Sequence, residues 1–176
     1  GLAVFDFNTS QVVHWDRVSL CNGRYMPSKN IDYIRDFIAR HEHFFLHCFV
    51  ILIERQIRCN MRIVEAVLQA LFHDRCLIIA ARSIKVHFGI STKNYRGNKA
   101  KAVEWASQFI QANPYAFRPG VQLVFNDNTK CDDLADALLL LMYYLDTYSN
   151  QLTASFRAPS LDASDVQTGG LAASDA

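Results

Sequence analysis

The sequence predicts an α/β fold in which helices flank a mixed sheet. Two β-rich runs at the start of the chain are separated by a short turn signal, which predicts an antiparallel hairpin. Six consecutive apolar residues at positions 48–53, bounded by polar residues, suit a central strand that is covered on both faces. Segments with helical spacing of apolar residues then alternate with further apolar runs, an order typical of βαβ units.

The expected elements follow one another without internal repeats. The hairpin occupies residues 2–7 and 11–20, and residues 21–26 are a candidate third strand. After a break at residues 27–30 we expect, in order, a helix to about residue 40, the strand 48–53, a helix at 61–72, a parallel strand at 76–81, a helix at 98–112 and a final helix at about 132–148. Ribonuclease-H-like folds have this order of elements, although the order alone is weak evidence for function.

Size and composition indicate one domain. The 176 residues lie within the usual range for a single domain, and we expect it to span residues 1–150. Residues 151–176 turn to Ala, Ser, Asp and Gly, which predicts a disordered tail. No apolar run approaches the length needed to cross a bilayer, so we expect a soluble protein without a membrane partner.

A carboxylate stands at the end of the central apolar run. Residues 48–53 stop at Glu54, which therefore falls at the carboxyl end of a strand, where open α/β sheets bind their ligands. Cationic and amide side chains follow directly, namely Arg55, Gln56, Arg58, Asn60 and Arg62. An acid at a sheet edge with such neighbours suits a metal ion that acts on a phosphate backbone.

The net charge of +1 conceals an uneven distribution. Residues 55–101 contain ten Lys and Arg against two acids, a net charge of +8, whereas the rest of the chain carries −7. Such asymmetry points to a polyanionic partner at one face, and a solvated basic face is the alternative. The residues that we expect to contact such a partner are Arg55, Gln56, Arg58, Arg62, Lys85, Lys93, Arg96, Lys99 and Lys101.

Three aspartates open the final helix. Asp132 and Asp136 are four residues apart, and Asp133 and Asp136 are three apart, so all three carboxylates can share one helix face. Asp132 and Asp133 could simply cap the helix and complement its dipole. Asp136 does not suit that interpretation, because apolar residues surround it and a buried carboxylate needs a cation or hydrogen-bond donors.

We therefore favour metal binding, with Glu54, Asp132, Asp133 and Asp136 as the candidate ligands. Their carboxylates are hard oxygen donors of the type that hold Mg²⁺ or Mn²⁺. Two such ions about 4 Å apart can activate water and stabilise the leaving oxygen in phosphodiester hydrolysis. The sequence thus predicts that acids distant in the chain converge at one site.

Three segments resemble motifs of the RuvC-type Holliday-junction resolvases, and the poxvirus and yeast mitochondrial branches are the nearest. They read I-E-R-Q at residues 53–56, N-Y-R-G-N-K-A-K-A-V-E-W-A at 94–106 and K-C-D-D-L-A-D-A-L-L-L at 130–140. The resemblance implies a ribonuclease-H-like fold, a homodimer, and Mg²⁺-dependent paired nicking of four-way DNA junctions. It also implies an intracellular location, in a cytoplasmic viral factory or in mitochondria.

The resemblance extends to single residues. Glu54 matches the strand ligand, Asp133 and Asp136 match the helix pair, and Asp132 competes with Asp133 for that role. Lys99 and Lys101 are candidates for contacting the scissile phosphate, or simply the DNA backbone. Gln56 could donate to a phosphate or orient Glu54. The apolar stripe at 61–72 is a candidate dimer interface, although it could equally be core.

One departure from the family pattern concerns the first strand. The family opens with D-x-G-x-x-N before L-A, and its Asp is a metal ligand, whereas this chain starts at Gly1 and the expected Asp would lie upstream. Asp6 is too late in the strand to replace it, so we interpret it as a hairpin residue. Two alternatives to a junction-resolving nuclease therefore stay open. One is a nucleic-acid-binding module with impaired catalysis, and the other is a nuclease for RNA–DNA hybrids or flaps.

Overall fold

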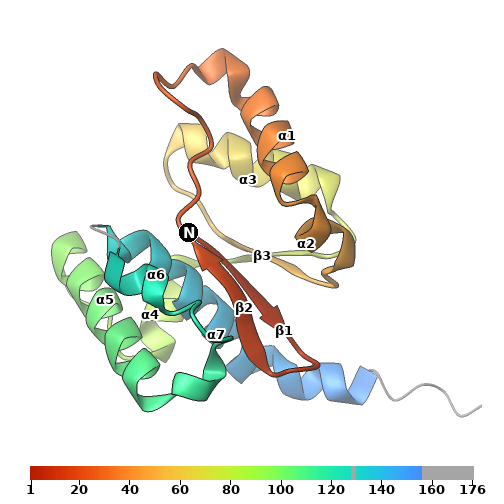
Figure 1. The fold of residues 1–176 in the computed structure, drawn as a ribbon. Helices are drawn as coiled ribbons and strands as arrows, with labels where there is room; N and C mark the ends of the chain where they lie inside the picture. The colour runs from red at the N-terminus through yellow and green to blue at the C-terminus, as the bar shows by residue number, and fades with distance from the viewer. Residues whose placement is uncertain (128–129, 156–176) are drawn as a thin grey trace, which may run out of the picture.

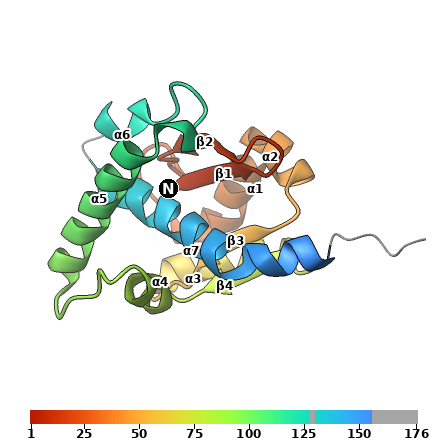
Figure 2. The same cartoon turned by 90° about the horizontal axis from the view of Figure 1, so that it is seen from below.

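The structure is a computed structural model that describes residues 1–127 and 130–155 (Figure 1). Its longest element is helix α7 (Cys131–Ser155), which runs across the middle of the molecule (Figure 2). The side chains of Leu134, Ala135, Leu138 and Leu139 are at most 1% exposed. The helix contacts β1, β3, α4, α5 and α6. The predicted final helix is therefore the core of the fold, as its apolar surface requires.

The predicted N-terminal hairpin is present. Strand β1 (Leu2–Asp6) pairs antiparallel with β2 (Gln11–Asp16). The Asp6 carboxylate accepts hydrogen bonds from the Asn8 backbone N–H (2.9 Å) and the Thr9 hydroxyl (3.0 Å), so it closes the turn as expected of a hairpin residue. Trp15 of β2 is buried, and its indole N–H donates to the carbonyl oxygen of Leu134 (3.0 Å). This bond fixes the first turn of α7 against the hairpin.

The predicted central strand pairs with the next one in parallel. Strand β3 (Ile51–Glu54) aligns Glu54 with Ile79 of β4 (Cys76–Ile79). Helix α3 (Cys59–Leu71) forms the crossover between them. Glu54 therefore stands at the carboxyl end of a parallel strand, as predicted.

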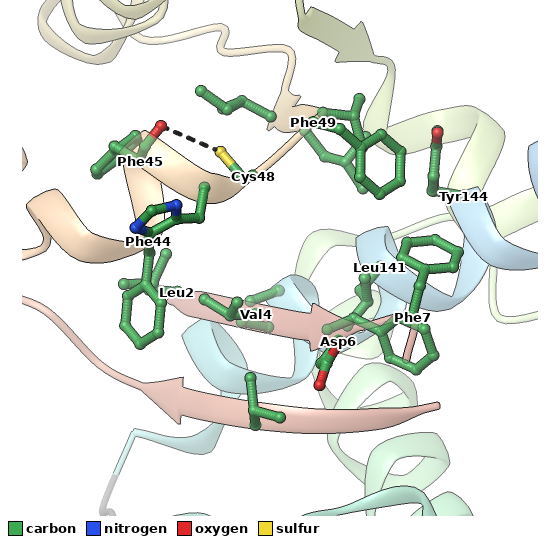
Figure 3. A pocket seen from close by; sticks show the side chains of 18 of the residues that line it. Leu2, Val4, Asp6, Phe7, Phe44, Phe45, Cys48, Phe49, Leu141 and Tyr144 are labelled. Carbon is green, nitrogen blue, oxygen red and sulfur yellow. Dashed lines mark hydrogen bonds between the residues drawn. The ribbon is translucent and has the colours of Figure 1, made fainter. Parts of the chain in front are cut away.

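The hydrogen-bonded sheet differs from the prediction in its continuity. Within the described residues the strands form two separate two-stranded sheets, β1–β2 and β3–β4. A pocket of about 820 Å³ lies between them, and its mainly apolar lining comes from β1, α2, the segment before β3, and α7 (Figure 3). Side chains bridge the two sheets instead of backbone hydrogen bonds: the rings of Phe7 and Phe49 are 5.0 Å apart.

The expected helix ending near residue 40 is α1 (Asn30–Arg40), which follows a 3-10 turn, η1 (Pro27–Lys29). A short helix that the sequence did not predict, α2 (Glu42–His47), comes next. The candidate strand at 21–26 is wrong, because this segment is an irregular loop whose residues from 22 onward are exposed and have no partner strand. Helix α1 contacts α3, and Figure 1 shows the two helices side by side.

The apolar stripe of α3 is divided between core and surface. Leu68 is buried, whereas Met61, Ile63 and Leu71 are exposed. The stripe is therefore only in part internal, and three apolar side chains on α3 face outward.

The C-terminal half consists of helices around α7. They are α4 (Ala81–His87), α5 (Tyr95–Ala112), the 3-10 turn η2 (Pro114–Ala116) and α6 (Leu123–Asp127). Ala102 and Ala106 of α5 are fully buried and allow α5 to pack closely along α7. Helix α7 continues to Ser155, past the predicted end at 148, and residues 156–176 of the predicted tail lie outside the described residues. None of the described helices is long and apolar enough to span a membrane.

Candidate active site

Glu54 at the end of β3 and Asp136 of α7 lie close enough to interact electrostatically, and the two elements that carry them are in contact. Burial is the main cause that raises the pKa of the Glu54 carboxyl, and the negative charge of Asp136 raises it further. Burial likewise raises the pKa of Asp136, and the charges of Asp132 and Asp133 add to the effect. The structure thus brings together two half-buried carboxylates that are more than 80 positions apart in the sequence.

The start of β1 enters the same acidic cluster. The charges of Asp133, Asp136 and Glu54 all act on the nitrogen of Gly1, so this nitrogen lies near the three acids. A Cβ atom at Gly1 would lie 2.1 Å from the Asp133 carbonyl oxygen and 2.9 Å from the Ala137 Cβ atom. Only glycine allows this close approach of strand and helix, and the approach places the backbone of β1 among the three acids.

The structure separates Asp132 from Asp133. Asp132 forms an ion pair with Lys99 of α5, which lowers the pKa of the aspartate and raises that of the lysine. Asp133 lies 3.4 Å from the Arg17 guanidinium just after β2, and both side chains are roughly half-exposed. Asp132 is therefore turned toward α5, whereas Asp133 is turned toward the hairpin and the start of β1.

The donor set fits a hard divalent cation in part. Glu54 and Asp136 offer only carboxylate oxygens, and two like charges that are partly removed from water gain from a cation between them. In the part of the chain that the structure describes, no group of three His, Cys, Asp or Glu side chains lies close enough to hold a metal ion. The arrangement is thus a carboxylate pair, with Asp133 nearby and engaged by Arg17.

Lys85 is a cation that interacts electrostatically with both half-buried acids, Glu54 and Asp136. It lies on α4, and its charge lowers the pKa of Glu54 and of Asp136, opposing the effect of burial on each. Lys99 also acts on Asp136 but is already paired with Asp132. Lys101 is exposed on α5, and none of the ion pairs within the described residues involves it. The sequence had assigned Lys85 only to nucleic-acid contact.

Gln56 braces the backbone beside Glu54. Its side-chain amide donates to the Glu54 carbonyl oxygen (2.8 Å), and its backbone N–H donates to the Glu65 carboxylate of α3 (2.5 Å). The Arg55 N–H donates to the Ile79 carbonyl oxygen (2.8 Å) and extends the parallel ladder by one step. These bonds hold the backbone of the loop after β3, and whether Gln56 orients the Glu54 carboxylate or donates to a phosphate stays a prediction.

The remaining predicted contact residues are exposed on the loop after β3 and near the starts of α3 and α5. Arg55, Arg58 and Arg62 line the loop after β3 and the first turn of α3, while Lys93 and Arg96 flank the start of α5. Sequence reasoning missed Arg17, because a lone arginine after a strand gives no signal of its own. Neither Glu54 nor Asp136 lines the apolar pocket between the sheets, although Gly1 and Ala137 do.

Comparison with known proteins finds similarity of structure but not of sequence. The fold is similar to the crystal structure of the fowlpox virus Holliday junction resolvase, with a TM-score of 0.51, 13% identity, and coverage of 82% of this chain and 86% of the resolvase. It is equally similar, at 12% identity, to the same resolvase in complex with its substrate Holliday junction DNA. No family model and no curated protein matches the sequence. The likeness confirms the predicted fold and, at the level of structure, the predicted resemblance to poxvirus resolvases.

Proposed function

We propose that this chain is a structure-selective DNA endonuclease that resolves four-way junctions by metal-dependent phosphodiester hydrolysis. The observation that carries the proposal is the Glu54–Asp136 pair with Lys85 beside it, set at the carboxyl end of β3. This pair occurs in a fold shared with a resolvase that has been solved with junction DNA. The fold alone would leave many activities open, so the argument depends on these side chains.

Glu54, Asp136 and Asp133 are the residues that would hold Mg²⁺ or Mn²⁺. When bound, such an ion lowers the pKa of a coordinated water and neutralises charge on the phosphate oxygens. Asp133 is preferred over Asp132, because Asp132 is paired with Lys99 while Asp133 faces the start of β1. Release of Asp133 from Arg17 would bring a third carboxylate toward the pair.

A carboxylate ahead of Gly1 would complete the acidic set. The Gly1 nitrogen faces Glu54, Asp133 and Asp136, so a residue joined to it would enter the chain at the cluster. This placement supports the expectation, drawn from the family resemblance, that an upstream Asp contributes to the site.

Lys85 is expected to stabilise negative charge at the cut phosphate. Its replacement in Lys85→Ala should reduce the single-turnover cleavage rate by about 100-fold, because a cation beside the reacting group is lost. Lys101→Ala is the matched comparison: this exposed lysine should affect binding and its salt dependence but change the rate by no more than about threefold. Quenched-flow cleavage of a labelled junction at saturating protein measures both. Equal rate losses in the two variants would contradict the assignment of Lys85.

The partner that we propose is branched DNA, contacted by the exposed cations at positions 55, 58, 62, 93 and 96. A homodimer would match the two-fold symmetry of a four-way junction and allow two symmetric cuts. Met61, Ile63 and Leu71 of α3 are exposed apolar residues that could meet across such a dimer. Sedimentation of junction-free protein at micromolar concentration tests this, and a monomer at every concentration would contradict it.

A direct assay compares substrates. This chain, and the same chain with the family's Asp-containing segment joined ahead of Gly1, are incubated in Mg²⁺ with a four-way junction, a flap, an RNA–DNA hybrid and a linear duplex. We expect paired nicks in the junction, and faster cutting by the extended form. Junction binding without cleavage by either form would instead identify a catalytically impaired binding module. Preferential cutting of the hybrid or flap would identify a different nuclease of the same fold.

A further inference from the structure

An exposed aromatic ring stands beside the acidic site at the first residue of α5. Tyr95 is 63% exposed, and Lys93 and Arg96 on either side of it are exposed as well. The ammonium group of Lys99 lies 5.1 Å from the centre of its ring. A solvent-facing aromatic ring among cations has the composition of sites that stack nucleic-acid bases and hold the backbone.

The backbone on both sides of Tyr95 is held in place. The Asn94 side-chain oxygen accepts from the Gly97 N–H (2.6 Å) and caps the helix. The Asn98 side-chain oxygen accepts from the Thr92 N–H (2.6 Å) and from its hydroxyl (2.7 Å). A Cβ atom at Gly97 would lie 2.8 Å from the Thr92 hydroxyl oxygen, so the turn is closed tightly around glycine. The ring is therefore presented by a constrained turn, which reduces the entropy lost when it binds.

A single lysine links this ring to the acids. Lys99, which lies against Tyr95, also pairs with Asp132 at the start of α7. Asp133 and Asp136 follow within the next turn of the same helix. The position of the ring relative to the carboxylates is therefore set by one short chain of contacts rather than by a long loop.

We propose that Tyr95 stacks on an unpaired base next to the phosphate that is cut, and so selects the cleavage position at the branch point. The inference rests on the proposed function and adds a specificity-determining residue to it. Unpaired bases have exposed faces, which an aromatic ring recognises by stacking whatever the sequence. Lys93 and Arg96 would hold the phosphates on either side of that base. Lys99, which contacts the ring and pairs with Asp132, would keep the ring at a fixed position relative to the acids.

Photocrosslinking tests the contact itself. Four-way junctions carry 5-iododeoxyuridine at successive positions around the branch point and are irradiated in complex with the protein without a divalent ion, so that the DNA stays intact. We expect one position, adjacent to the mapped cut site, to give an adduct on the peptide that contains Tyr95. Tyr95→Phe keeps the ring and should keep the adduct, whereas Tyr95→Leu should lose it.

Tyr115 provides a matched control. It is 89% exposed but lies in η2 beyond the other end of α5, a helix about 27 Å long, and has no flanking lysine or arginine. Tyr115→Leu should bind and cut like the unaltered protein. Tyr95→Leu should bind the junction about tenfold more weakly and spread its cuts over several positions, and Tyr95→Phe should do neither.

The results separate this inference from the proposed function. If the unaltered chain, in either form, never cleaves the junction, the nuclease assignment fails. If it cleaves while Tyr95→Leu retains the affinity, the cut positions and the crosslinking pattern of the unaltered protein, the role of Tyr95 alone is overturned. An adduct that maps to another residue also overturns it.

Discussion

Replacing Glu54 by glutamine is expected to reduce junction cleavage on the order of a thousandfold while junction affinity stays within about threefold. The amide preserves the shape of the side chain at the end of β3 and the backbone bonds that Gln56 makes there. It removes the negative charge that, together with Asp136, would hold the catalytic cation. The DNA contacts are expected from exposed cations elsewhere, so binding should survive.

Cleavage rate and affinity are measured on the same preparation, with labelled junction in Mg²⁺ for the first and in Ca²⁺ for the second. Glu42→Gln is the matched control, because it makes the same chemical change on an exposed position of α2. It should behave like the unaltered protein. Cleavage by Glu54→Gln at the normal rate would show that Glu54 is not part of the catalytic site.

The second large effect is on stability, and its sign is opposite to that of most substitutions of buried residues. Asp136→Asn should abolish cleavage yet raise the free energy of unfolding of the metal-free protein, on the order of 1 kcal/mol at neutral pH. Burial and neighbouring acids hold the pKa of Asp136 above its ordinary value. The charged carboxylate therefore destabilises the folded state, and the neutral amide of asparagine removes this destabilisation.

The pH dependence follows from the same shift. A carboxyl whose pKa is raised on folding binds more protons folded than unfolded, so its contribution to stability falls as pH rises from the unfolded pKa, about 4, through the folded one. Urea midpoints measured from pH 4 to 7 should therefore decline more for the unaltered protein than for Asp136→Asn. Added Mg²⁺ should raise the midpoint of the unaltered protein and have little effect on the variant. A variant less stable at neutral pH would mean that Asp136 has a stabilising partner in the folded protein.

The sequence located the acids because each breaks a strong apolar pattern. Glu54 ends the run at 48–53, and Asp136 interrupts an otherwise apolar helix; both patterns arise from burial, which a single sequence records well. The two strand pairs and the main helices were predicted from the same kind of apolar pattern. The pattern could not separate Asp132 from Asp133, since their difference lies in contacts with Lys99 and Arg17 from other elements.

Short elements were harder to predict. Helices α2 and α4 have six and seven residues, too few to show a helical period, and both are stabilised by packing rather than by propensity. The failure to predict α4 has the largest consequence, because Lys85 lies on this helix and acts on both Glu54 and Asp136. From the sequence alone, Lys85 is one of several cations in residues 82–101, a segment without acids.

The gap between the two sheets could not be predicted at all. Whether β1 and β3 pair through backbone hydrogen bonds depends on how the side chains between them pack. Here the rings of Phe7 and Phe49 are in contact and line a pocket between the two sheets. Periodicity identifies which residues are strands, but it carries little information on whether two strands distant in the chain share hydrogen bonds.

Diffraction at the manganese absorption edge tests the central claim most directly. Crystals of the unaltered protein and of Asp136→Asn are prepared in Mn²⁺ without DNA, so that both proposed ligands are intact in the first set. We predict an anomalous peak between the Glu54 and Asp136 carboxylates in the unaltered protein, and its loss in Asp136→Asn. A peak bound elsewhere, with residue 54 and Asp136 turned apart, would contradict a metal-dependent nuclease site at the end of β3.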